Sequence, residues 1–219
     1  NACRLLLETN KVMNLTAITE LSDVITKHFV DSLLLVLAAP ELGLKLDASS
    51  KYSCIDVGTG AGFPGIPLKI AFPGLKITLL DSLNKRVGFL NEVIEALGLT
   101  DITAVHGRAE DYGRDPKYRE QFDLCVSRAV ANMSTLSEYC IPFVKKGGYF
   151  IPYKSGKADE EIEQAKSAVK KLGGELKEVI VKVLPETDVE RTFVPVKKMA
   201  VTAKKYPRKA GLPGKEPLK

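Results

Sequence analysis

Residues 54–65 read CIDVGTGAGFPG, and this apolar run leading into a glycine-rich turn constrains the fold more than any other feature. The apolar and β-branched residues suit a buried strand, and the glycines let the backbone turn sharply without a Cβ beside a ligand. Pro64 suits the first turn of a following helix. A turn without a ligand is the alternative, but four glycines in so short a stretch cost conformational entropy that such a turn would not need. The stretch therefore predicts a nucleotide-type cofactor site.

The next apolar run, residues 75–80, is followed by an acidic residue, Asp81. An acidic side chain at this place can accept hydrogen bonds from a ribose diol. Gly60, Gly62 and Gly65 match GxGxxG, which also describes the NAD-binding turn, so the site suits NAD or S-adenosylmethionine. The fuller pattern, Asp56 two residues before GxGxG, resembles motif I of the class I S-adenosylmethionine-dependent methyltransferases.

Strand and helix patterns alternate along the rest of the chain. We predict helices at 3–39, 65–72, 84–97, 131–144 and 157–172, and strands at 52–57, 75–80, 101–106, 122–127 and 147–153. Such alternation predicts a parallel, doubly wound α/β sheet. Two β-rich runs, 175–184 and 192–203, predict an antiparallel pair at the sheet edge. We therefore expect a Rossmann-like class I methyltransferase fold, with a mostly parallel seven-stranded sheet, an antiparallel last strand and an N-terminal helical cap; a dinucleotide dehydrogenase does not end this way.

Length and composition predict one main domain, because 219 residues that are 45% hydrophobic can bury one α/β core and a small extension. We expect a helical cap with its linker at 1–50, a methyltransferase domain at 51–203 and a basic C-terminal segment at 204–219. The chain begins with Asn1, so we expect either an upstream natural start or a short cloning remnant.

The net charge of +5 is concentrated in residues 204–219, and the rest of the chain is neutral. The six cations there, against Glu216 alone, are Lys204, Lys205, Arg208, Lys209, Lys215 and Lys219. A basic segment on a neutral body is typical of polyanion binding, although a solvated terminus is an equally good explanation from charge alone.

Several classes of protein are disfavoured. The longest apolar stretch, 29–39, is interrupted by Asp31 and Ser32, so we expect no membrane span, no signal peptide and a cytoplasmic protein. The four cysteines lack CxxC spacing, which favours reduced thiols and argues against disulfides or a metal site. No coiled-coil pattern indicates an obligate dimer, so we expect a monomer.

Seven short motifs, in this order and spacing, resemble the bacterial 16S rRNA (guanine-N7) methyltransferase family RsmG, also called GidB. They are MNLTAI at 13–18, HFVDSL at 28–33, DVGTGAGFPG at 56–65, DSLNKR at 81–86, RAE at 108–110, SRAV at 127–130 and PRKAG at 207–211. The resemblance spans almost the whole chain. Two departures are that the family's usual helix upstream of Leu5 is missing and that residues 113–121 are longer than in some members.

The resemblance implies S-adenosylmethionine as cofactor and a guanine of 16S rRNA, within the 30S subunit, as methyl acceptor. The cofactor-binding residues would be Asp56, Gly58, Gly60, Phe63, Asp81, Ala109, Glu110 and Arg128. Gly58 and Phe63 would line the pocket, Asp81 would face the ribose, and Ala109 with Glu110 would flank the adenine. Arg108, Arg128 and Arg191 would be the catalytic residues, gripping phosphates and the guanine O6/N7 edge.

Guanine N7 attacks with a lone pair that carries no proton, so the reaction needs no general base and no covalent nucleophile, and alignment supplies most of the acceleration. The chain correspondingly lacks an Asn-Pro-Pro-Tyr loop and a Pro-Cys pair.

Other interpretations stay open for individual residues. Glu110 could be an exposed loop carboxylate, and Arg191 could form a surface ion pair with Glu190 or Asp188. His28 and His106 suit structural roles, because no nucleophile or metal cluster accompanies them. Asn14 and Asp31 suit helix capping and packing.

Three alternatives to an rRNA methyltransferase remain: a methyltransferase for a small molecule or protein, an NAD-binding oxidoreductase, and a non-catalytic RNA-binding module. The first predicts an apolar pocket over the cofactor and needs no basic tail. For an rRNA enzyme, we expect truncation after Lys204 to weaken RNA binding more than cofactor binding.

Overall fold

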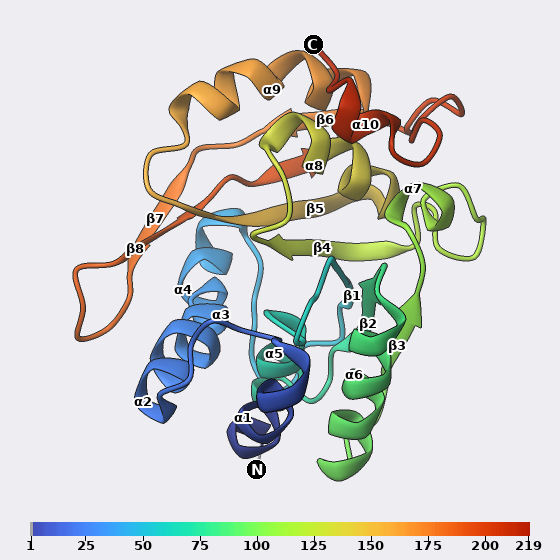
Figure 1. The fold of residues 1–219 in the computed structure, drawn as a ribbon. Helices are drawn as coiled ribbons and strands as arrows, with labels where there is room; N and C mark the ends of the chain where they lie inside the picture. Colours follow the sequence, from blue (N-terminus) through green and yellow to red (C-terminus); the bar gives the residue numbers. More distant parts are fainter. Residues whose placement is uncertain (1) are drawn as a thin grey trace.

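The computed structural model describes residues 2–219, and Asn1 lies outside the described residues (Figure 1). Its centre is a sheet in which five strands pair in parallel in the order β3-β2-β1-β4-β5. These strands are β1 Ser53–Val57, β2 Lys76–Asp81, β3 Ile102–His106, β4 Phe122–Arg128 and β5 Val144–Ser155. Asp56 is in register with both Leu79 and Val126, so the carboxyl ends of β1, β2 and β4 lie at one edge. The predicted parallel sheet is confirmed.

The two predicted β-rich runs form the antiparallel end of the sheet, and each is broken into two strands. These strands are β6 Gly174–Leu176, β7 Ile180–Val183, β8 Glu190–Phe193 and β9 Val196–Lys198. β8 and β9 both pair antiparallel with β5, while β7 pairs with β8 and β6 with β9. Pro195 separates β8 from β9, because proline has no N–H for the ladder. Within residues 2–219 the sheet therefore has nine strands, seven of them along its main path.

Helices cover both faces of the sheet (Figure 1). α5 Gly65–Ala71 and α6 Asn84–Ala96 lie on the face that the N-terminal helices share, and α8 Met133–Cys140 and α9 Asp159–Lys171 lie on the other. α8 is shorter than the predicted helix 131–144. Asn132 caps it by accepting a 3.0 Å hydrogen bond from Thr135 N, and a 3₁₀ turn, Ile141–Phe143, follows it at Pro142. The chain can then enter β5 at Val144, earlier than predicted.

The N-terminal part is helical, as predicted, and packs on the sheet. It comprises α1 Ala2–Met13, α2 Leu21–Val24, a π-helix Ile25–Val30, α3 Asp31–Leu33, α4 Leu35–Ala38 and a 3₁₀ turn Ala39–Leu42. Leu6 and Leu35 are buried in the same cluster as Phe63 and Leu79. Tyr153 of β5 donates a 2.6 Å hydrogen bond to the carbonyl of Ser32. The segment boundaries at 50 and 203 stay predictions.

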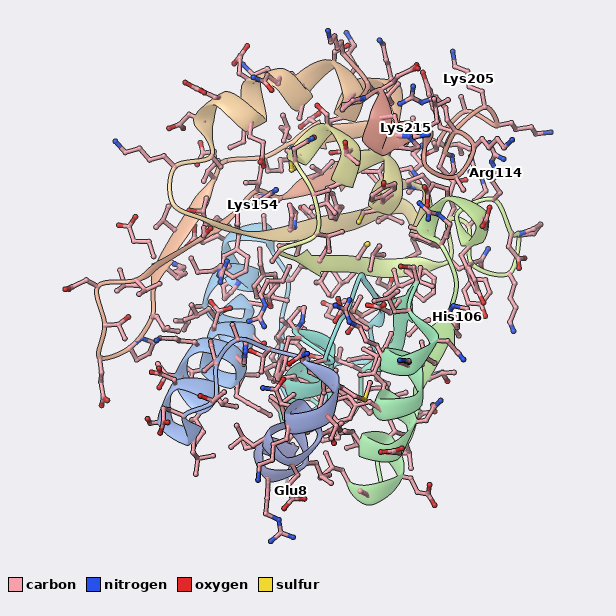
Figure 2. All side chains as sticks on the ribbon, in the orientation of Figure 1. Glu8, His106, Arg114, Lys154, Lys205 and Lys215 are labelled. Atoms are coloured by element: carbon pink, nitrogen blue, oxygen red, sulfur yellow. The ribbon has the colours of Figure 1, made fainter. Side chains whose placement is uncertain are left out.

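The C-terminal residues include the short helix α10 Leu212–Lys215, which contacts α8 (Figure 1). The helix α7 Ala109–Tyr112 contacts α8 as well. Lys205 and Lys215 lie on the same side of the molecule as Arg114 (Figure 2).

Among residues 2–219, no helix is long and apolar enough to cross a membrane. The same residues contain no group of three or more His, Cys, Asp or Glu side chains placed to hold a metal ion. All four cysteines are free, and Cys54, Cys125 and Cys140 are buried.

Candidate active site

Asp56 holds the glycine-rich turn closed. Its buried Oδ2 accepts hydrogen bonds from Thr59 Oγ1 at 2.7 Å and from Gly65 N at 2.8 Å. Burial raises the pKa of Asp56 to about 6, although the bonds from Thr59 and Gly65 act in the opposite direction. A Cβ at position 65 would overlap Leu79 and lie 2.9 Å from Asp56 Oδ2, so only glycine fits there. Asp56 therefore fixes the shape of the turn and does not line the cavity at the strand ends.

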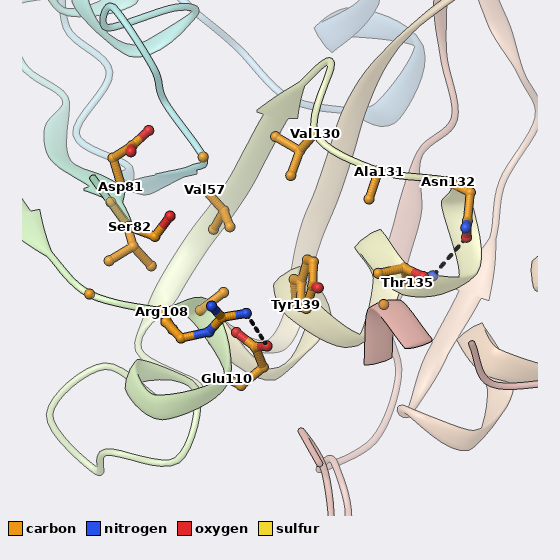
Figure 3. Close-up of a pocket in the computed structure, with 15 residues that line it drawn as sticks. Val57, Asp81, Ser82, Arg108, Glu110, Val130, Ala131, Asn132, Thr135 and Tyr139 are labelled. Carbon is orange, nitrogen blue, oxygen red and sulfur yellow. Dashed lines mark hydrogen bonds and ion pairs between the residues drawn. The ribbon is translucent and has the colours of Figure 1, made fainter. Parts of the chain in front are cut away.

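A cavity of about 370 Å³ lies beyond the carboxyl ends of β1 to β4 (Figure 3). It is lined by Val57, Gly58, Leu80, Asp81, Ser82, Gly107, Arg108, Ala109, Glu110, Val130, Ala131, Asn132, Thr135, Tyr139 and Gly214. Asp81 lies on the β2 side, and Thr135 and Tyr139 lie on the α8 side. Ligands of open α/β sheets bind at this edge, and apolar walls with a few polar groups are typical of such sites.

Gly58 lets the segment that follows β4 approach the turn. Its φ of +70° is unfavourable for other residues, and a Cβ there would lie 2.6 Å from Val130 Cγ2. The backbone of Gly58 and the side chain of Val130 therefore form one wall of the cavity.

Asp81 is buried at the end of β2 and binds the backbone of the turn. Its Oδ2 accepts from Gly60 N and its Oδ1 from Leu83 N, both at 2.9 Å, and Arg86 Nη1 lies 3.6 Å from Oδ2. A carboxylate offers about four acceptor positions, so Asp81 can still accept bonds from ligand hydroxyls. The acceptor positions left on Asp81 thus fit the hydroxyls of a ribose-containing cofactor.

Glu110 is buried at the start of α7, so its interpretation as an exposed loop carboxylate is wrong. Its Oε1 lies 3.3 Å from Arg108 Nη2 and accepts a 2.8 Å hydrogen bond from Gly211 N. Arg108 itself is half exposed at the rim of the cavity. Glu110 therefore joins the cavity to the C-terminal segment.

Arg128 and Arg191 meet at Asp31, on the far side of the glycine-rich turn. Asp31 Oδ2 accepts from Arg128 Nη1 at 2.6 Å and from Arg191 Nη2 at 2.9 Å, and Oδ1 accepts from Arg191 Nε at 2.7 Å. All three side chains are largely buried. The interpretation of Arg191 as a surface ion pair with Glu190 or Asp188 is wrong, and Asp31 does more than cap or pack a helix. Two cations share one carboxylate, which leaves a local excess of positive charge.

His28 completes this second cluster. Its Nδ1 lies 3.0 Å from Arg128 Nη2, its Nε2 lies 2.7 Å from Thr16 Oγ1, and its ring stacks on Phe63 at a centroid distance of 4.7 Å. Burial and the neighbouring Arg128 lower the pKa of His28 to about 4, so the ring is neutral at pH 7. Arginine can only donate, so we assign Nδ1 as the acceptor and Nε2–H as the donor to Thr16. His106 lies apart, with Nε2 3.1 Å from Ser82 O.

The predicted site residues thus fall into three groups. Gly58, Asp81, Arg108, Ala109 and Glu110 line the cavity. Phe63 and Arg128, expected among the cofactor-binding residues, do not line the cavity and belong with Arg191 to the cluster around Asp31 and His28. Asp56 and Gly60 lie in the turn between them.

The remaining cavity residues were not predicted from the sequence. Val130 and Asn132 lie in the short connection between β4 and α8, so the rule that ligands bind beyond strand ends could have found them. Tyr139 and Gly214 carry no local signal, because only packing brings α8 and the C-terminal segment to the cavity. A second cavity of about 210 Å³ contacts Ala129, Tyr153, Lys154 and Arg191, so residues 129–131 separate the two spaces.

The strand order, the glycine-rich turn after β1 and the acidic residue at the end of β2 define a class I methyltransferase fold. Among solved structures the fold is similar to a mutant of MtNAS in complex with S-adenosylmethionine, with a TM-score of 0.59 and 17% identity over 90% of this chain and 74% of that chain. At this identity the likeness concerns the fold alone.

Sequence comparison specifies the family within that class. The family model described as rRNA small subunit methyltransferase G matches residues 2–194. The ribosomal RNA small subunit methyltransferase G of Lachnoclostridium phytofermentans is 55% identical, covering 98% of this chain and 86% of the relative. That of Clostridium botulinum is 50% identical, covering 98% and 87%. The chain belongs to the rRNA small subunit methyltransferase G family, which confirms the resemblance seen in its motifs.

Proposed function

We propose that this protein transfers the methyl group of S-adenosylmethionine to N7 of a guanine in 16S rRNA. The observation that carries the proposal is family membership across residues 2–194, with relatives that are 50% and 55% identical over 98% of the chain. Membership of this family disfavours the NAD-binding oxidoreductase and the methyltransferases for small molecules or proteins.

The cavity beyond β1 to β4 is the proposed cofactor site. Asp81 would accept hydrogen bonds from the ribose hydroxyls, Ala109 and Glu110 would lie beside the adenine, and Gly58 would leave room along the wall. When bound, S-adenosylmethionine supplies a methyl group on a positively charged sulfur. The acceptor N7 carries no proton, so the residues of this chain need to position two reactants and exclude water rather than remove a proton.

The cluster around Asp31 is the proposed RNA grip. Asp31 holds the guanidinium groups of Arg128 and Arg191 in fixed orientations, and their excess positive charge suits a phosphate or the guanine O6/N7 edge. Phe63 stacks with His28 and lies below Arg128, whose guanidinium carbon is 5.2 Å from the ring centroid. Arg108, at the cavity rim, would contact the RNA from the other side.

The partner of this site would be 16S rRNA within the 30S subunit, and ribosomal RNA as substrate would make the enzyme cytoplasmic. We propose a monomer that uses no metal. The exposed lysines of the C-terminal segment, Lys204, Lys205, Lys209 and Lys215, support RNA binding because cations near a site attract a polyanion.

The test is transfer of labelled methyl from S-adenosylmethionine to 30S subunits purified from cells that lack this enzyme, followed by nucleoside analysis of the 16S rRNA. We expect 7-methylguanosine with the native protein and its loss with Arg128→Ala. Lys166→Gln, a change at an exposed ion pair on α9, is the control and should keep activity. Cofactor binding by calorimetry without incorporation into RNA would point to a different acceptor.

A further inference from the structure

The C-terminal segment is anchored by one buried ion pair. Glu138 of α8 is completely buried, and Arg208 approaches it with its backbone and its guanidinium. Arg208 N lies 2.7 Å and Nε 3.0 Å from Glu138 Oε1, and Nη2 lies 2.8 Å from Oε2. Such a bidentate ion pair fixes the orientation of the guanidinium group as well as its distance from the carboxylate. Arg208 is thus occupied inside the protein, unlike the lysines beside it.

Further bonds carry the segment to the cavity. Gly211 N donates to Glu110 Oε1 at 2.8 Å, and Thr135 Oγ1 donates to the carbonyl of Pro213 at 3.0 Å. Glu110, Thr135 and Gly214 all line the cavity. The segment therefore supplies part of the cavity wall and holds two other parts in place.

The chain that leads into the segment is fixed as well. Arg119 donates to the carbonyls of Thr202 and Tyr206, both at 2.7 Å, and Arg114 Nε donates to the carbonyl of Pro207 at 2.8 Å. These bonds fix the residues that precede Arg208 and so place Arg208 beside Glu138. The ion pair is therefore the last fixed contact before Gly211 and Gly214.

We infer that residues 207–214 complete the wall of the cofactor cavity, through Gly214 directly and through Glu110 and Thr135 indirectly, and that Arg208 and Glu138 are the positioning pair that holds this segment. The inference rests on the proposed function, because it takes this cavity to be the cofactor site. The basic segment then has two roles. Its lysines are exposed to solvent, whereas Arg208, Gly211 and Gly214 help to shape the cofactor cavity. Truncation after Lys204 would weaken both cofactor and RNA binding, which replaces the expectation from the sequence of an effect mainly on RNA.

Loss of the pair has a defined consequence. Without Arg208, the carboxylate of Glu138 is left buried and unpaired, a state that proteins avoid by rearranging or taking up a proton. The segment would move away from α8, Glu110 would lose the Gly211 donor, and the cavity would open toward Gly214. We expect the Kd for S-adenosylmethionine to rise at least tenfold.

The experiment compares Arg208→Gln with Lys209→Gln, which removes a neighbouring exposed cation. Titration calorimetry measures the Kd for S-adenosylmethionine, and thermal unfolding without cofactor reports whether the fold persists. Arg208→Gln should weaken cofactor binding tenfold or more, Arg208→Lys should restore part of it, and Lys209→Gln should change it less than twofold. Equal cofactor affinity in the native protein and Arg208→Gln would overturn the inference.

A second variant keeps the test open if Arg208→Gln does not fold. Gly214→Val leaves the ion pair intact and adds a side chain whose Cβ would lie 3.4 Å from Tyr139 Oη. It should weaken cofactor binding, and an unchanged Kd would show that the segment is no wall. If the native protein itself bound no S-adenosylmethionine, the proposed function would fail instead, so the two failures are distinguishable.

Discussion

Arg128, at the end of β4, donates a 2.6 Å hydrogen bond to Asp31, which lies 97 residues earlier at the start of α3. The bond joins the N-terminal helices to the strand end beside the glycine-rich turn. Arg191 of β8 shares the same carboxylate, so one buried acid connects three parts of the chain. The RNA grip proposed above depends on this single carboxylate.

Asp31→Ala should destabilise the protein by about 3 kcal/mol, because removing one partner of a buried ion pair leaves the remaining charges uncompensated. Asp23→Ala is the matched control: it breaks an exposed pair with Lys27 in the same N-terminal region and should cost about 0.5 kcal/mol. Urea unfolding of both variants measures the difference. Similar losses in the two variants would show that the Asp31 pair contributes no more than a surface pair.

His28 should titrate with a midpoint of about 4 in the folded protein. Its folded pKa lies below the ordinary value, so between about pH 4 and 6.5 the folded state binds fewer protons than the unfolded state, and stability falls as the pH is lowered through that window. The ring proton signals followed by NMR against pH give the midpoint. The chain has two histidines, and His106→Gln identifies which signal belongs to His28. A midpoint near 6.5 would contradict the buried, neutral ring.

Asp56 should change stability with pH in the opposite direction to His28. Its folded pKa of about 6 lies above the ordinary value, so its protonation stabilises the folded state at low pH, and this contribution is lost as the pH rises from about 4 through 6. Asp56→Asn cannot titrate, so the stability of the native protein relative to this variant should fall by about 2 kcal/mol between pH 4.5 and pH 7. Urea unfolding at the two pH values measures the change, and a constant difference would contradict the raised pKa.

Gly58→Ala should destabilise the protein by about 1–3 kcal/mol and weaken binding of S-adenosylmethionine, because its positive φ disfavours a side chain and its Cβ would press on Val130. Gly88→Ala in α6 is the control, since nothing lies within 4 Å of a Cβ there. It should stabilise the protein by about 0.5–1 kcal/mol, because alanine favours a helix interior. Thermal unfolding and calorimetry distinguish the two. A neutral Gly58→Ala would contradict the close approach of Val130 to the turn.

The salt dependence of RNA binding should report the exposed lysines of the C-terminal segment. Replacing Lys204, Lys205 and Lys209 together by Gln should reduce the slope of log K against log salt by about 2, since each phosphate contact on single-stranded RNA contributes about 0.7. Binding to a 16S rRNA fragment at several salt concentrations measures the slope. An unchanged slope would mean that these lysines do not contact phosphates.

Much of the fold and part of the candidate site could be predicted from local pattern. The apolar strands, the glycine-rich turn and their alternation with helices predicted the parallel sheet, because each element depends mainly on residues close in sequence. Asp81 and Glu110 could be placed for the same reason: parallel strands end at one edge, so residues that follow them meet there. Strand breaks such as the one at Pro195 were not predicted, because the sequence of each β-rich run resembles that of one continuous strand.

The sequence by itself therefore determined the fold class, the family and the strand-end residues of the cavity. Only the tertiary structure decided that Asp31 binds Arg128 and Arg191, that Glu110 is buried against Gly211, and that Arg208 faces Glu138. These partners are 70 to 160 residues apart in the chain. Hydrogen-bonded strands and helices follow local periodicity, whereas these three contacts form only because the packing of distant elements brings their groups within a few ångströms.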